Sequence, residues 1–307
     1  MRKFKKAGLI LATSAMMSMC AVPAFAGATG LGEVQLNTQQ NVPLAGSSVG
    51  GFTGTINSNA GTAVDNTKAA ELINGFNAKL NAAQNFGVEE KIHMTMSMTD
   101  GTKNESMSTD SERYSVVNGD NAYITVKNAS YDNGVLAETD SSEQYYIKNG
   151  AYHNAYEVKN GTVVASEVIP AMNLKENYFP IKVHGNETVT LENGEYVVRG
   201  YMLKEDYANS STIGGEDVLS SIGLTDDVTA EMNAALTNMP YELHFTADGD
   251  LTYMQIDMSG LINGVMSIYR AIYGDAIADL GISGQMIYSS QFNINPALTF
   301  VLPSYIH

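Results

Sequence analysis

The chain has 307 residues, and its 33 acidic side chains outnumber its 17 basic ones, which gives a formal net charge of −16. A charge of this sign repels nucleic acids and anionic membrane surfaces, so we expect neither as a partner. The single cysteine, Cys20, excludes an intrachain disulfide, and the fold must be stabilised by ordinary burial of apolar side chains.

The first 26 residues have the pattern of a bacterial export signal. Basic residues at the N-terminus precede an uncharged, mostly apolar stretch at 7–22, and Ala24-Phe25-Ala26 is a small-x-small cleavage site. Cys20 follows a methionine rather than the small residue of a lipoprotein signal, so we interpret it as part of the signal peptide. We expect cleavage after Ala26 and a secreted or envelope-associated protein of a Gram-positive bacterium. No other stretch approaches the roughly 20 apolar residues of a transmembrane segment.

The rest of the chain divides into two parts. Residues 27–65 are rich in Gly, Ser, Thr, Asn and Gln and show no apolar period, which indicates a flexible, low-complexity leader. Residues 66–307 carry regular apolar patterns, and we expect them to form a single domain.

A helix is predicted directly after the leader. Its apolar positions recur at helical spacing, with Thr67 as the capping residue at its start and Gly87 as its stop. The stripe consists of Ala69, Leu72, Ile73, Phe76, Leu80 and Ala83.

The pattern then changes to a period of two. Every second residue between Lys91 and Thr99 is apolar, which predicts a strand with one buried face. Asn-Gly and Asp-Gly dipeptides then separate short runs rich in Tyr, Val, Ile and Thr, as in successive antiparallel hairpins. The predicted strands are 113–117, 122–126, 144–148, 151–158, 162–169, 187–191, 196–202, 241–246 and 251–258.

Helical spacing returns in the C-terminal third. One helix is predicted from Thr225 to Pro240. A second helix is predicted at 261–277, and its apolar stripe covers so much of the helix circumference that neighbours must enclose it on several sides. Closing strands are predicted at 285–293 and 297–302. The pattern therefore predicts an α+β fold, in which a curved antiparallel β-meander forms an incomplete barrel and helices pack on its concave face.

No motif predicts catalysis, a cofactor or a metal site. Gly46-Ser47-Ser48-Val49-Gly50 matches the letters of the serine-hydrolase elbow, but it lies in the leader without the strand and helix that this elbow requires. The five histidines show no zinc-binding spacing, and the carboxylates are dispersed. We expect no enzyme, although a hydrolase whose carboxylates meet only in space stays an alternative.

The order of elements resembles the lipoprotein-carrier superfamily, the LolA and LppX relatives and their secreted Gram-positive cousins. The resemblance covers about residues 67–303 and rests on the opening helix and strand, the strand-turn-strand at Tyr145–Tyr152, strand 251–258 with the helix after it, and residues 298–303. It implies an incomplete barrel whose concave side is plugged by helices, with apolar ligands between them. No ligand-contacting residue of the family is carried over.

Two hypotheses for the function follow. The first is an exported, non-enzymatic protein that holds a lipid or another apolar ligand between sheet and helices. The methionines of the strand at 91–99 would then line the ligand site, and ordinary core packing is the alternative explanation for them. The second is a structural or protein-interaction module of the cell envelope, with a protein partner at the cell surface. The ligand-contacting residues expected under the first are Ile92, Met94, Met96, Met98, Leu261, Val265, Met266, Tyr269 and Ile272.

Overall fold

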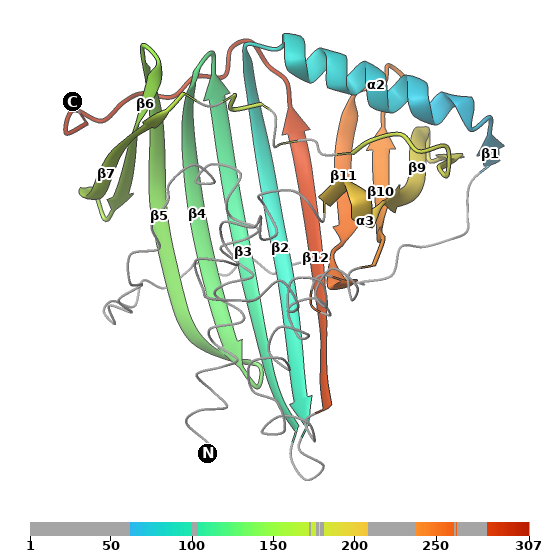
Figure 1. Ribbon diagram of the computed structural model, residues 1–307, viewed down its shortest axis with the longest axis horizontal. Helices are drawn as coiled ribbons and strands as arrows, with labels where there is room; N and C mark the ends of the chain where they lie inside the picture. Colours follow the sequence, from blue (N-terminus) through green and yellow to red (C-terminus); the bar gives the residue numbers. More distant parts are fainter. Residues whose placement is uncertain are drawn as a thin grey trace.

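The computed structural model describes residues 62–99, 104–171, 173–175, 178, 181–207, 237–260, 262 and 281–306. This part of the chain is mostly β, with one twelve-stranded antiparallel sheet and one substantial helix (Figure 1). The strands are β1 (Thr62–Val64), β2 (Asn85–Thr99), β3 (Asn104–Asn118), β4 (Asn121–Asp132), β5 (Val135–Asn149), β6 (Tyr152–Lys159), β7 (Thr162–Pro170), β8 (Thr188–Glu192), β9 (Glu195–Met202), β10 (Met239–Phe245), β11 (Leu251–Asp257) and β12 (Gly281–Asn293). The helices are α2 (Thr67–Ala82) and the short α3 (Lys204–Tyr207). The signal peptide, nearly all of the leader, and the helices predicted at 225–240 and 261–277, apart from residues 237–240 and Ile262, lie outside the described residues.

The sheet consists of two meanders joined side by side. Strands β2 to β7 follow one another in sheet order, and so do β8 to β12, while β12 pairs with β2 along its whole length. Strands β1 and β7 form the two edges, and each pairs on one side only within the described residues. The sheet is therefore not closed into a barrel.

The predicted hairpins are confirmed, and the backbone of their turns explains why Asn-Gly dipeptides indicate them. Asn133-Gly134, Asn160-Gly161 and Asn193-Gly194 have positive φ at both residues. This backbone matches the twist of the flanking strands, and asparagine followed by glycine adopts it at the lowest steric cost. Most strands are longer than predicted, because polar residues continue the backbone pairing where the apolar alternation has stopped.

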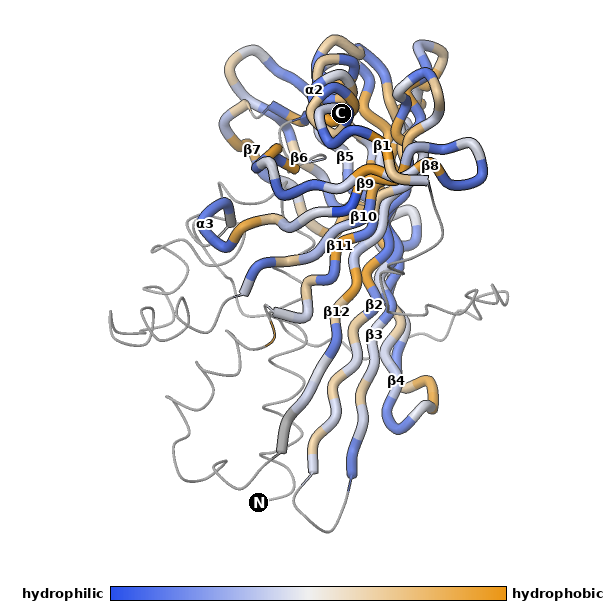
Figure 2. The backbone as a smooth tube through the Cα atoms, turned by 90° about the vertical axis from the view of Figure 1, so that its right-hand side faces the viewer, coloured by the Kyte–Doolittle hydropathy of each residue, from blue (hydrophilic) through white to orange (hydrophobic). Residues whose placement is uncertain are grey.

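Helix α2 runs across one end of the sheet, over β12, β11 and β10 (Figure 1). Its predicted stripe is buried from Ala69 to Leu80, and the Phe76 ring meets those of Phe245 and Phe292 edge-on at centroid distances of 6.5 Å and 5.2 Å. The resulting α2 core cluster includes residues of β2, β3 and β4 as well as of β8 to β11. Figure 2 shows the most hydrophobic colours concentrated toward this end of the sheet.

Both predicted ends of this helix are wrong. Thr67 does not cap the start; instead its backbone N–H donates to the carboxylate of Asp65 at 2.9 Å. The helix ends at Ala82, where the ammonium of Lys175 donates to the carbonyls of Asn81 and Ala83. A lysine that reaches the last carbonyls satisfies the helix end as a glycine stop would.

The end of the chain corrects a second prediction. Residues 294–306 contain no strand, so the strand predicted at 297–302 is wrong. This tail packs on the sheet face opposite α2, where Phe300 lies 5.9 Å from the Tyr123 ring and Ile306 joins a small cluster with Tyr145 and Val158. Gly87 lies within β2 rather than ending the helix, and the tail passes it at Leu298.

Candidate functional site

The candidate site lies on the inner face of the sheet, which we define as the face that packs against α2. On β2 this face carries Phe86 and Val88, which belong to the α2 core cluster, and then Glu90. Beyond Glu90 come the four predicted residues Ile92, Met94, Met96 and Met98, which are only 9%, 1%, 1% and 8% exposed. None of these four belongs to the described α2 core cluster. Strand β2 thus carries a second buried apolar surface.

The strands on both sides of β2 extend this surface. In the sheet register, Met286 of β12 lies opposite Met94, and Met107 of β3 lies opposite Met96. Met286 is buried and Met107 is half-buried. Methionine is unbranched and adapts its shape to an irregular partner. We call this surface the methionine strip: Ile92, Met94, Met96, Met98, Met107 and Met286.

The segment that follows β11 reaches the inner face beside this strip. Ile262 is 2% exposed, and a Cβ added at Gly284 of β12 would lie 2.8 Å from its Cδ1 atom. Gly284 is opposite Met96 in the register, so the missing side chain lets Ile262 approach the sheet there. The predicted contacts Leu261, Val265, Met266, Tyr269 and Ile272 lie outside the described residues.

A buried ion pair separates the two apolar surfaces. Glu90 of β2 and Arg113 of β3 are opposite one another, with 3.4 Å between Glu90 Oε2 and Arg113 Nε. The Tyr288 hydroxyl donates to Glu90 Oε1 at 2.8 Å, and the guanidinium lies 5.9 Å from the centre of the Tyr178 ring. Burial lowers the pKa of Arg113, but the attraction of Glu90 and the neighbouring phenols outweighs it, so the pKa ends above its ordinary value.

Buried hydroxyl groups surround the ion pair. The Tyr178 hydroxyl contacts Ser115 and Arg113, and the Tyr288 hydroxyl contacts Ser290, although these contacts fall short of good hydrogen-bond geometry. Ser115 is next along β3 on the same face as Arg113, and Ser290 of β12 is opposite Glu90. We call Glu90, Arg113, Ser115 and Ser290 the polar cluster.

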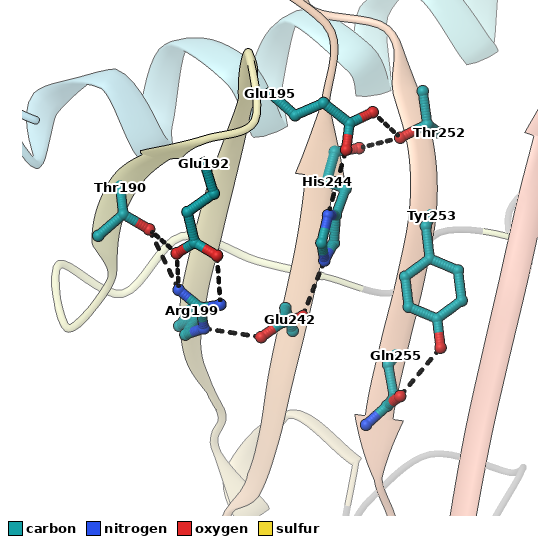
Figure 3. A network of polar contacts seen from close by, with 9 residues as sticks. All are labelled: Thr190, Glu192, Glu195, Arg199, Glu242, His244, Thr252, Tyr253 and Gln255. Carbon is teal, nitrogen blue, oxygen red and sulfur yellow. Dashed lines mark hydrogen bonds and ion pairs between the residues drawn. The ribbon is translucent and has the colours of Figure 1, made fainter. Parts of the chain in front are cut away.

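A second polar network lies on the opposite, outer face. Arg199 donates to Glu192 at 2.6 Å and to Glu242 at 2.7 Å, while His244 is 2.7 Å from Glu242 and 3.4 Å from Glu195 (Figure 3). Thr190 and Thr252 complete the network at 3.1 Å from Arg199 and Glu195. These contacts join β8, β9, β10 and β11.

The charges of this outer network stabilise one another. The bond from Arg199, helped by Thr190, lowers the pKa of Glu192 to about 2. The bond to Glu242 raises the pKa of His244, although burial opposes it. Its ionic groups pair with one another at short distances, so we interpret the outer network as structural.

Sequence reasoning missed the polar cluster, although one signal was present. Glu90 falls in phase with the apolar side of β2, between Val88 and Ile92, where a charge is unexpected. Its partner could not be read from the sequence, because the predicted strand covered only 113–117 and gave no register. In the described part of the chain, no group of three or more His, Cys, Asp or Glu side chains could hold a metal ion.

The comparisons with known proteins add only a broad likeness. No family model and no curated protein matches the chain. A β-barrel-like protein of domain of unknown function DUF1849 from Brucella abortus is 8% identical, with a TM-score of 0.20, and the match covers 68% of this chain and 98% of that one. A DUF1329 family protein from Desulfovibrio piger is 11% identical, with a TM-score of 0.15, and the match covers 77% and 96%. These weak matches assign the chain to no family.

In the described helices, no stretch has the length and apolar character needed to cross a bilayer.

Proposed function

We propose that this protein is an exported, non-enzymatic binding protein that holds a lipid or another apolar molecule against the inner face of its sheet. The observation that carries this proposal is the methionine strip, a buried surface of mostly unbranched side chains that is separate from the α2 core cluster. Such side chains suit acyl chains of varied shape, because they change conformation at little cost.

The course of the chain after β11 supports the same proposal. The Met258 backbone N–H donates to the carbonyl of Met286 at 2.8 Å, and the Met286 N–H donates to the Ser259 hydroxyl at 3.1 Å. These bonds attach the start of the segment to β12, and Ile262 lies on the inner face. The rest of the apolar stripe predicted at 261–277 lies outside the described residues.

The protein's own content tests the proposal. We expect solvent extraction of the purified, secreted protein to release an apolar molecule, native mass spectrometry to show its mass on the folded chain, and a fluorescent fatty acid to bind to delipidated protein. If the native mass equals that of the bare chain, nothing is extracted and the fluorescent fatty acid does not bind, the proposal is wrong.

A second candidate function, a protein-interaction module of the cell envelope, is favoured by strand β7. This edge strand has nine residues, and Val164 and Val168 are 53% and 66% exposed. Most proteins protect such an edge, and an unprotected one can add a strand from another chain. Under this alternative, Val168→Lys abolishes binding to an envelope partner, and binding of the fluorescent fatty acid is absent.

A further inference from the structure

Three two-residue turns of the sheet share one dipeptide and one backbone conformation. Asn133-Gly134 joins β4 to β5, Asn160-Gly161 joins β6 to β7, and Asn193-Gly194 joins β8 to β9. The asparagines have φ angles of 51°, 52° and 52°, each following glycine also has a positive φ, and both residues of every turn are exposed. Asn118 and Asn149 also precede glycine, but each ends a strand and has no positive φ. The three turns therefore form a matched set.

An asparagine that precedes glycine can react with its own main chain. The glycine nitrogen, once a base has removed its proton, attacks Cγ of the asparagine, and glycine has no side chain to obstruct the approach. The new N–Cγ bond closes a succinimide ring, while the Cγ–Nδ2 bond breaks and the amide leaves as ammonia with a proton from solvent. Water then opens the ring on either side, which yields aspartate or isoaspartate. The reaction needs water and a base and no other reactant.

The three turns differ in how the asparagine side chain is held. Asn133 Oδ1 accepts from the Ser106 backbone N–H at 2.9 Å, and Asn133 Nδ2 donates to Asp132 Oδ1 at 3.0 Å. These bonds fix the carboxamide at the start of β3, so Cγ cannot turn toward the next main-chain nitrogen without breaking them. Among the described residues, no hydrogen bond reaches the carboxamide of Asn160 or Asn193. In these two turns the side chain can rotate toward the glycine nitrogen.

We propose that Asn160 and Asn193 are sites of spontaneous deamidation and that Asn133 is protected by its side-chain hydrogen bonds. This inference goes beyond the proposed function and does not depend on it. Because two hydrogen bonds must first break at Asn133, we expect this residue to react about tenfold more slowly than the other two.

Deamidation of Asn193 affects the outer network. Asn193 lies between Glu192 and Glu195, which pair across the turn and contact Arg199 and His244, respectively (Figure 3). Aspartate adds a negative charge beside these carboxylates, and isoaspartate also lengthens the main chain inside a turn of two residues. Both products disturb the pairing that places the carboxylates, whereas the same reaction in the turn between β6 and β7 leaves the network intact.

Ageing of the purified, secreted protein in mildly alkaline buffer tests the inference. Peptide mapping by mass spectrometry follows the loss of each amide and separates the aspartate peptide from the isoaspartate peptide. We expect Asn160 and Asn193 to react at similar rates and Asn133 about tenfold more slowly. In protein unfolded with urea the three sites should react alike, because unfolding removes the bonds of Asn133.

Variants connect the difference to the side-chain bonds. Asp132→Ala removes the partner of Asn133 Nδ2 and should speed deamidation of Asn133 severalfold. The matched control is Lys159→Ala, which changes the corresponding residue before Asn160 and should leave the rate there unchanged.

A second pair of variants tests the effect on the outer network. Asn193→Gly and Asn160→Gly each remove one reactive amide, and Gly-Gly suits the same turn. During ageing the urea midpoint of Asn193→Gly should fall less than that of Asn160→Gly. Equal falls would contradict the effect on the network.

Three outcomes of the ageing experiment overturn the inference. Equal rates at all three sites in the folded protein would show that the bonds of Asn133 do not protect it. A slower reaction of Asn133 in urea as well would assign the difference to neighbouring residues rather than to the fold. If Asn160 and Asn193 keep their amides in the folded protein and lose them in urea, the turn itself prevents the reaction.

Discussion

Glu90 and Arg113 face one another across β2 and β3, 3.4 Å apart at Oε2 and Nε, and each side chain is only 9% exposed. Two buried charges at this separation attract strongly, but each has lost its hydration, so the pair as a whole contributes little net stability. The loss of one partner is a different matter, because the other charge then stays buried alone.

The single and double variants of this pair should therefore differ in stability. We expect Arg113→Met to lower the free energy of unfolding by about 3–5 kcal/mol, and Glu90→Leu/Arg113→Met to lie close to the wild-type value. Urea denaturation followed by circular dichroism measures both. An additive loss in the double variant would show that the two charges are not coupled.

Two glycines should respond to alanine in opposite directions. Gly284→Ala adds a Cβ 2.8 Å from Ile262 Cδ1 and 2.9 Å from the Thr95 carbonyl, so we expect a loss of about 1–3 kcal/mol. Gly75→Ala, in α2, meets nothing within 4 Å and should stabilise by about 0.5–1 kcal/mol. The variant Gly284→Ala/Ile262→Val should recover part of the loss. Equal stability of Gly284→Ala and the wild type would show that Ile262 does not pack on β12.

The outer network predicts that the contribution of His244 to the free energy of unfolding falls with rising pH. The bond to Glu242, with burial opposing it, raises the folded-state pKa of His244 above the unfolded value of about 6.5. The stabilisation is therefore complete below pH 6.5 and is lost as the pH rises through the raised pKa. The difference in unfolding free energy between the wild type and His244→Gln should shrink as the pH rises above about 6.5. A difference that stays constant as the pH rises would contradict the raised pKa.

The stabilisation that Glu192 contributes should be lost at low pH. Its folded-state pKa of about 2 lies below the ordinary 4.5, mainly through the bond from Arg199, so its stabilisation is present above pH 4.5 and is lost as the pH falls toward 2. Glu192→Gln should be less stable than the wild type at pH 6, with the gap closing in acid. The exposed Glu138→Gln on β5 controls for the loss of one negative charge. The prediction fails if both variants show the same dependence on pH.

Local patterns were enough to predict α2 and the hairpins. The spacing of Ala69 to Leu80 and the Asn-Gly turns are local signals, and the contacts of α2 with the sheet reinforce them. The first half of β3 was missed, because residues such as Ser108 and Asp110 show no apolar alternation, although their backbone pairs with β4 as regularly as the rest.

Two features depended on contacts that the sequence does not state. The alternation of Leu298, Phe300 and Leu302 is typical of a strand, yet here Phe300 packs on the rings of Tyr123 and Tyr145 from an irregular tail. The pairing of Glu90 with Arg113 depends on the register between two strands. Of the candidate site, the sequence therefore predicted the apolar half on β2 and not the polar half.

The central claim is that the inner face beside β2 holds an apolar molecule, and a pair of neighbouring substitutions tests it most directly. Met96→Gln places an amide of similar size in the methionine strip, and Ser97→Gln places the same amide on the outer face of the same strand, where the position is exposed. We expect the affinity of the delipidated protein for a fluorescent fatty acid to fall about tenfold in Met96→Gln and to stay unchanged in Ser97→Gln, because burying one unpaired amide against an apolar chain costs about 1–3 kcal/mol. Equal affinities of the wild type and Met96→Gln, with both variants folded, would contradict the account.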